Sequence, residues 1–194
     1  MNNVSKMLKE DHRRVQELFQ RFDATEEEQE RQEIARNAIQ ELDVHAALEE
    51  ELVYPFLREE DVEMDKLHEA NEEHYVAHLL IGELRDMQPR DPAFAAKFRV
   101  LAESVRHHIK EEESQILPKL DKADGDLEAL EERVLARKEE LMAQKQNGRN
   151  GSARSRGGRT GQPRGTARRA QEQEGPIAAG PDLSSRSRAR AGRR

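Results

Sequence analysis

Apolar residues recur every three or four positions through the first 146 residues of this 194-residue chain, a spacing typical of amphipathic α-helices. Proline and glycine are sparse in that part, and β-branched runs are absent. Because long amphipathic helices with short connections bury their apolar faces best against one another, the sequence predicts an all-α, up-down-up-down four-helix bundle. Its four apolar stripes are Val4, Leu8, Val15, Phe19 and Phe22; Ile34, Ala38, Leu42, Leu52 and Phe56; Met64, Leu67, Ala70, Ile81 and Leu84; and Phe94, Phe98, Leu101, Val105 and Ile116.

Local sequence signals place helix ends between these stripes. Thr25 followed by Glu28 predicts a capping box, and Asp91-Pro92 predicts an N-cap with proline in the first turn. A further apolar series predicts a short fifth helix at about residues 124–146, and its members are Leu127, Leu130, Val134 and Leu141.

The charge changes sign near residue 146. Residues 147–194 contain 12 arginines and three acids, a net charge of +9, whereas the other 21 basic and 37 acidic residues give −16. The tail has too few apolar residues to offset chain entropy, so we expect it to be disordered. Its arginines favour nonspecific binding to nucleic acid or another polyanion, and a purely solvated extension remains the alternative. The predicted units are therefore a domain at 1–146, with a bundle at 1–120, and a tail at 147–194.

Composition excludes several kinds of site. The chain has no cysteine, which excludes disulfides, thiolate zinc sites, iron–sulfur clusters and cysteine nucleophiles. It lacks an apolar run of about 20 residues, so we expect no membrane span. The first residues lack the apolar region of a secretion signal, and we therefore expect a cytoplasmic location.

Five of the seven histidines fall on the apolar stripes. His45 and His108 are each followed four residues later by a glutamate on the same helix face, Glu49 and Glu112. The other three histidines on the stripes are His12, His74 and His78. His68 and His107 lie off the stripes, so we expect them at the surface or behind the site.

So many buried imidazoles and carboxylates require compensation. A lone histidine on an apolar face is usually a hydrogen-bonded core residue, and a lone His-x-x-x-Glu is usually a surface pair. Without partners, however, the whole set would cost several kcal/mol per group, which a domain of this size cannot sustain. A pair of metal ions held by imidazoles and bridged by carboxylates removes this cost. Nitrogen and carboxylate donors without sulfur suit iron or manganese, and zinc less specifically.

The pattern also repeats within the chain. His45-x-x-x-Glu49-Glu50 is followed by Pro55, and His108-x-x-x-Glu112-Glu113 is followed by Pro118 at the same distance. Upstream, Asp11-His12 matches Glu73-His74. Two helix pairs with the same ligand pattern are the layout of a dinuclear carboxylate-bridged site in a bundle.

At these residues the sequence resembles the hemerythrin-like family of HHE cation-binding domains over about residues 1–120. The resemblance rests on the histidines and glutamates above, with Tyr54-Pro55 and Leu117-Pro118. It implies a non-haem diiron centre bridged by oxo or hydroxo, with manganese or zinc less favoured. By the resemblance, one iron is ligated by His12 and His45, the other by His74, His78 and His108, and Glu49 bridges with a helix-four carboxylate. The repeat favours Glu112 for that carboxylate, and Glu113 remains open because a π-bulge would rotate it inward.

Three functions fit such a centre. The favoured one is binding, sensing or storage of dioxygen or a related small molecule. The second is a diiron peroxidase, a catalase-like enzyme or a nitric oxide-reactive enzyme. Tyr54 and Tyr75 lie near the ligands in sequence, where packing beside the site is favoured over a role as electron relays. The third is an iron-homeostasis or regulatory protein whose basic tail binds a polyanion.

Overall fold

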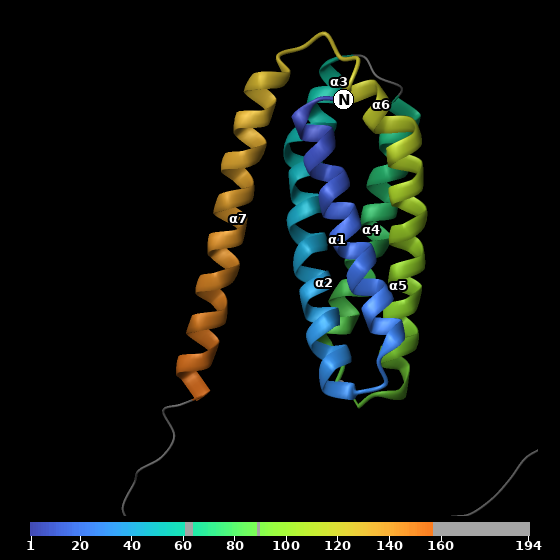
Figure 1. Ribbon diagram of the computed structural model, residues 1–194, viewed down its shortest axis with the longest axis vertical. Helices are drawn as coiled ribbons and strands as arrows, with labels where there is room; N and C mark the ends of the chain where they lie inside the picture. Colours follow the sequence, from blue (N-terminus) through green and yellow to red (C-terminus); the bar gives the residue numbers. More distant parts are fainter. Residues whose placement is uncertain (61–63, 89, 157–194) are drawn as a thin grey trace, which may run out of the picture. The chain divides into compact units, whose positions relative to one another are not determined.

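The computed structural model describes residues 1–60, 64–88 and 90–156, and this part of the chain contains helices and no strand. The elements in order are α1 (Asn3–Ala24), α2 (Glu28–Leu48), η1 (Glu49–Val53), α3 (Tyr54–Glu59), α4 (Met64–Asp86), α5 (Pro92–Glu111), η2 (Glu112–Ile116), α6 (Leu117–Leu120) and α7 (Leu127–Arg156). Helices α1, α2, α4 and α5 run alongside one another in alternating directions (Figure 1). The predicted four-helix bundle is therefore confirmed.

The repeat in the sequence is also a repeat in the backbone. A five-residue π-helical turn begins at Glu49 in η1 and at Glu112 in η2, each directly after a long helix. Each turn closes with a wide hydrogen bond, from the Tyr54 N–H to the Glu49 carbonyl and from the Leu117 N–H to the Glu112 carbonyl. The next residue in each case is proline, which lacks an N–H and crowds the carbonyl four residues earlier. A wider turn relieves this crowding, so both prolines favour a π-turn where the glutamates lie.

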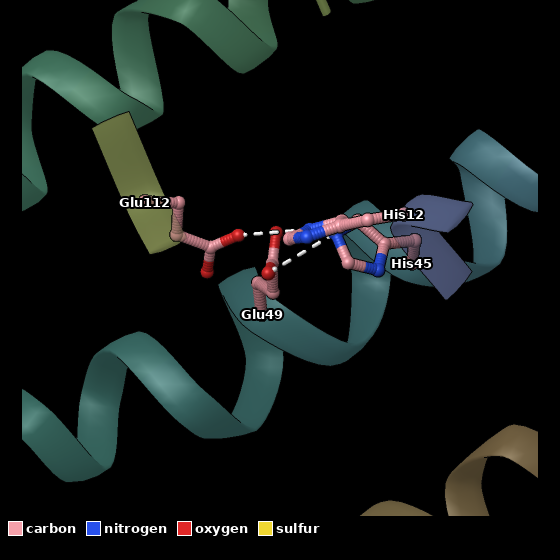
Figure 2. Close-up of side chains that lie close together, drawn as sticks. All are labelled: His12, His45, Glu49 and Glu112. Carbon is pink, nitrogen blue, oxygen red and sulfur yellow. Dashed lines mark hydrogen bonds and ion pairs between the residues drawn. The ribbon is translucent and has the colours of Figure 1, made fainter. Parts of the chain in front are cut away.

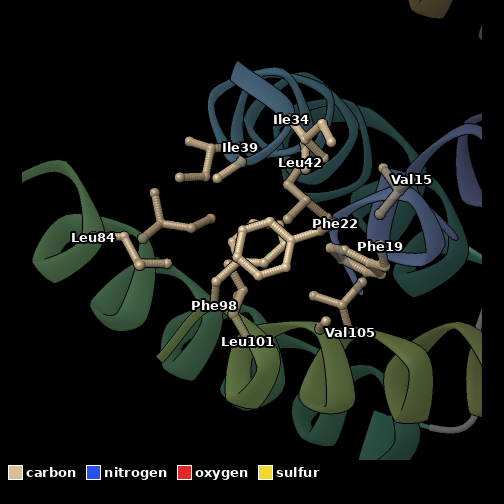
Figure 3. Packing of buried hydrophobic residues seen from close by; sticks show 14 of the residues in the cluster. Val15, Phe19, Phe22, Ile34, Ile39, Leu42, Leu84, Phe98, Leu101 and Val105 are labelled. Atoms are coloured by element: carbon tan, nitrogen blue, oxygen red, sulfur yellow. The ribbon is translucent and has the colours of Figure 1, made fainter. Parts of the chain in front are cut away.

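Two apolar clusters fill the bundle at different heights. The first is built around Phe19, Phe22 and Phe98, whose rings pack with residues of α2, α4 and α5 (Figure 3). The second contains Leu8, Tyr54 and other side chains from the end where α3 and α6 lie. On each of α1, α2, α4 and α5, the buried histidine falls between residues of the first cluster and residues of the second. The candidate site is therefore enclosed by apolar side chains along the bundle.

Helix α7 covers α1 and α2. Its Leu130 and Val134 join the second apolar cluster. Three of its cations form ion pairs with acids of the bundle: Arg137 with Glu51, Lys138 with Asp11, and Lys145 with Asp43. The fifth helix is therefore present but longer than predicted, since it runs to Arg156 and past the expected end at residue 146. The rest of the predicted tail, residues 157–194, lies outside the described part.

One predicted helix cap is confirmed and one is wrong. The Asp91 carboxylate accepts a hydrogen bond from the Ala93 N–H at 2.8 Å and caps α5. Thr25 instead ends α1, and its hydroxyl donates to the Glu30 carboxylate at 2.7 Å. Helix α2 begins after Glu27, whose side chain makes no cap. The connection thus needs two more residues than the capping box predicted. Within the described ranges, no helix is both long and apolar enough to cross a membrane.

We expect Leu101→Ala to lower the free energy of unfolding by about 2–5 kcal/mol, because Leu101 is fully buried in the first cluster and its loss leaves a cavity. The same change at Leu79, which is 53% exposed on α4, should alter it by less than about 0.5 kcal/mol. Urea unfolding of both variants measures the difference. Equal effects would contradict the packing described here.

Candidate metal centre

Four imidazoles and two carboxylates meet inside the bundle, and all six side chains are buried. Helices α1, α2, α4 and α5 each contribute one histidine, and the two π-turns contribute the glutamates. The six are His12, His45, His74, His108, Glu49 and Glu112. Their nitrogen and oxygen atoms fall into two adjoining groups.

The first group contains His12, His45, Glu49 and Glu112 (Figure 2). The two Nε2 atoms of His12 and His45 lie 3.0 Å apart. Glu112 Oε2 lies 3.0 Å from His12 Nε2, and Glu49 Oε1 lies 3.2 Å from His45 Nε2. One donor-type atom from each of the four residues lies within 4.8 Å of the others.

The second group contains Glu49, His74 and His108. The two Nε2 atoms of His74 and His108 face each other at 3.1 Å. Glu49 Oε2 lies 3.3 Å from His74 Nε2 and 4.0 Å from His108 Nε2. The Glu49 carboxylate thus directs one oxygen to each group, which is the placement of a bridging carboxylate.

Carboxylates also face the outward nitrogen, Nδ1, of the four buried histidines. Three of the contacts are 2.8–2.9 Å long and the fourth, between Asp11 and His45, is 3.9 Å long. The pairs are His12 with Glu113, His74 with Glu50, His108 with Glu73, and His45 with Asp11. A neutral imidazole that donates its Nδ1 proton to a carboxylate presents the Nε2 lone pair inward, ready to bind a cation.

These outer acids follow the internal repeat. Glu50 and Glu113 come directly after the buried glutamates, while Asp11 and Glu73 come directly before His12 and His74. We found these residues in the repeat but did not predict that they would contact the imidazoles of another helix. The sequence does contain a signal for these contacts, because an acid next to a predicted ligand occurs at four matching positions of the repeat.

The two candidates for the second bridging carboxylate are separated by their positions. Glu112 is fully buried in the first group, whereas the Glu113 side chain is 36% exposed and reaches His12 Nδ1. A π-turn is present, as the Glu113 alternative required, but it begins with Glu112 pointing inward. The geometry therefore favours Glu112.

His78 is the one predicted ligand that the structure does not bring into either group. Its side chain is 46% exposed, and its Nε2 lies 3.3 Å from Glu50 Oε1. The buried face of α4 runs through Ala70, His74 and Ile81, and His78 lies at the edge of that face.

The two tyrosines named from the sequence differ in position. Tyr54 is fully buried, its ring stacks on His74 with centroids 5.7 Å apart, and its hydroxyl donates to Glu49 Oε2 at 3.5 Å. Burial, with the charge of Glu49, raises the pKa of Tyr54 well above its usual value, so this phenol keeps its proton. Tyr75 is 59% exposed.

The charged groups of the cluster shift one another's pKa values. Burial alone would raise the pKa of Glu49, but the nearby imidazoles of His45 and His74 keep that pKa well below its usual range. Burial and the charge of Glu49 raise the pKa of Glu112. Desolvation opposes protonation of His74, yet hydrogen bonds to Glu49 and Glu50 raise its pKa to about 9. Protons therefore compete with any cation that binds these groups.

The donor atoms are better placed to bind a pair of cations than to hydrogen-bond to one another. Both Glu112 oxygens, Glu49 Oε1 and His45 Nδ1 are buried without a hydrogen-bond partner, since their close contacts lack hydrogen-bond geometry. Within each histidine pair, two facing Nε2 atoms share at most one proton. Orphaned buried polar atoms are rare, because each costs about 1–3 kcal/mol. Imidazole nitrogens and carboxylate oxygens around two adjoining points match a dinuclear site for iron, manganese or zinc.

A small cavity adjoins the cluster. Its volume is about 30 Å³, and all four buried histidines line it together with His78. The rest of the wall is mainly apolar and includes Val15, Leu42, Ala77, Ile81, Val105 and Ile109. The space holds about two water-sized molecules.

The raised pKa of His74 predicts how the stability of the metal-free protein depends on pH. A group whose pKa rises from 6.5 to about 9 on folding contributes stability that is complete below pH 6.5 and is lost as the pH rises through 9. We therefore expect the free energy of unfolding, measured by urea in chelator, to fall by up to about 3 kcal/mol over that window.

Glu50→Gln should reduce this fall, because it removes a carboxylate that holds the His74 proton. The matched change Glu51→Gln should leave the slope unaltered, because Glu51 pairs with Arg137 instead. Identical pH slopes for the two variants would contradict the role given to Glu50.

Comparison with known proteins identifies the family of the chain. Residues 3–120 match the family described as Hemerythrin HHE cation binding domain. The chain is 28% identical over 134 residues to an uncharacterized hemerythrin-like protein of Schizosaccharomyces pombe, covering 67% of this chain and 65% of that protein. It is 30% identical over 114 residues to a DNA nickase of Nostoc, covering 59% of this chain and 32% of the nickase.

A solved structure shares the fold. It is the crystal structure of a hemerythrin HHE cation binding domain-containing protein from Mycobacterium kansasii, with a TM-score of 0.63 and 24% identity over 74% of this chain and 90% of that one. The match over residues 3–120 covers more than half of the sequence. The chain therefore belongs to the hemerythrin HHE cation-binding domain family.

Proposed function

We propose that this protein holds two iron ions in the two adjoining groups and reversibly binds dioxygen or a related small molecule beside them. The observation that carries the proposal is the Glu49 carboxylate, whose two oxygens each face a separate pair of imidazoles. The donor set supports iron, and the family of the chain supports a cation site.

The proposed ligands are the six buried residues. His12, His45 and Glu112 would hold one ion, His74 and His108 would hold the other, and Glu49 would bridge them. His78, which the resemblance implied as a ligand, is assigned here to the cavity wall, because its imidazole contacts Glu50. The second group then has one protein donor fewer than the first, which leaves room there for an external ligand.

The surroundings determine what reaches the site. Bound iron ions would supply the reversible electron transfer that dioxygen binding needs. The apolar wall, with Val15, Leu42 and Ile81, excludes bulk water and favours a small neutral molecule. At about 30 Å³ the cavity does not accommodate a larger organic substrate.

One observation favours an enzyme as the second candidate. The buried Tyr54 lies against both His74 and Glu49, a position suited to passing an electron to or from the site. A peroxidase or catalase-like reaction with hydrogen peroxide is small enough for the same cavity. Sustained peroxide consumption that falls in Tyr54→Phe would favour this alternative over reversible binding.

One test of the proposed function concerns the number of bound ions. Purified protein loaded with Fe²⁺ under anaerobic conditions should retain about two ions per chain after desalting. Glu112→Gln should retain about one, because the amide lacks the charge that a bridging or terminal carboxylate supplies. Glu113→Gln, the same change one residue further along, should retain both ions, since Glu113 contacts only the outer nitrogen of His12.

Metal analysis per chain measures this, with circular dichroism to check folding. A wild type that binds no metal would refute the proposed function. Equal loss in the two variants would refute the assignment of Glu112.

A further test of the proposed function concerns oxygen binding in the apolar cavity. The reduced, iron-loaded protein should develop a new visible absorption band when oxygen is added and lose it when oxygen is removed. Ala77→Leu should abolish the response without lowering the iron content, because the larger side chain fills the cavity.

Ala96→Leu is the matched control, since Ala96 is exposed on α5. A response of Ala77→Leu equal to that of the control would show that oxygen does not use this cavity.

A further inference from the structure

A second, smaller cavity reaches the buried cluster and differs from the first in its lining. Its volume is about 10 Å³, enough for about one water-sized particle. Three glutamates line it, Glu73, Glu111 and Glu112, together with Lys66 and His108. The apolar cavity suits a neutral molecule, whereas this acidic one suits a cation.

Two residues that line this acidic cavity, Glu73 and Glu111, also belong to a group of ligand-type side chains with His107. His107 Nε2 lies 3.6 Å from Glu73 Oε1 and 3.6 Å from Glu111 Oε1. The donor-type atoms of the three residues lie within 4.8 Å of one another. The His107 side chain is 62% exposed, so a cation reaches this group directly from solvent.

The inner part of the cavity reaches the proposed metal ligands. Glu73 uses its other oxygen, Oε2, to contact His108 Nδ1 at 2.8 Å. The fully buried Glu112 lines the same cavity, and neither of its oxygens has a hydrogen-bond donor. Acidic oxygens therefore extend from the exposed imidazole of His107 to an unpartnered buried carboxylate.

We propose that Glu73, His107 and Glu111 form a divalent-cation capture site that loads the buried centre through the acidic cavity. This inference rests on the proposed function, because it requires the buried centre to take up metal. An imidazole and two carboxylates bind Fe²⁺, Mn²⁺ or Co²⁺, and their exposure makes the site weak enough to release the ion inward.

Lys66 regulates the charge of this site. Its ammonium lies 3.7 Å from Glu111 Oε2 and 2.6 Å from Glu69 Oε2, and it lines the cavity. A cation that approaches Glu111 meets a like charge. Removing that charge is expected to favour capture, in the opposite direction to the loss of His107.

The test is the rate at which metal-free, full-length protein takes up Co²⁺, followed by visible absorption in a stopped-flow instrument at limiting metal. His107→Ala should slow uptake at least about threefold, and Lys66→Gln should speed it. Both variants should reach the wild-type number of tightly bound ions after desalting. His68→Ala, a change at an exposed histidine on α4, is the matched control and should load at the wild-type rate.

Each outcome decides between the two proposals. If wild type takes up no Co²⁺ into the buried centre, the proposed function fails. If wild type loads normally and His107→Ala loads at the same rate, only the capture site is refuted. Slower loading of Lys66→Gln than of wild type would also refute the capture site. Loss of the Lys66 charge should speed capture, whereas general damage to the structure would slow both Lys66→Gln and His107→Ala.

Discussion

Two fully buried carboxylates that face four buried imidazoles are the constraint on which the rest of this structure depends. Such groups are stable in an apolar interior only when opposite charge or hydrogen bonds compensate them. Outer acids at the Nδ1 atoms supply part of that compensation, and in the proposed function a pair of cations supplies the remainder. The apolar clusters on either side strengthen these interactions, because they keep the local dielectric constant low.

The internal repeat explains how one chain builds this arrangement twice. In each half, a helix brings a histidine and then a glutamate at the start of a π-turn, and a proline follows where that turn closes. The acid after each of these glutamates contacts an imidazole of another helix, and so does the acid before the histidine of each preceding helix. The same short sequence pattern therefore sets the backbone, the inward donors and their outer partners.

Access to the centre differs by charge. In the two proposals, the apolar cavity beside the four histidines admits small neutral molecules, and the acidic cavity lined by Glu73 and Glu111 admits cations. Helix α7 also contacts the surroundings of the centre, because its Lys138 pairs with Asp11, which lies 3.9 Å from His45. Burial lowers the pKa of Lys138 to about 8, yet the ammonium stays close to both Asp11 oxygens.

The sequence by itself determined the helices, the bundle and the faces of four histidines, because these follow from a periodicity of three to four residues along each helix. Periodicity places a residue on a face only within about 40°. The repeat already favoured Glu112 over Glu113, but periodicity also placed His78 on the inward face, where its side chain is 46% exposed. Tertiary structure decided these positions, because the π-turns set the rotation of each glutamate and the neighbouring helices set which imidazoles meet. The contacts of Glu50 and Glu73 with distant histidines likewise depend on helix packing, which no local pattern encodes.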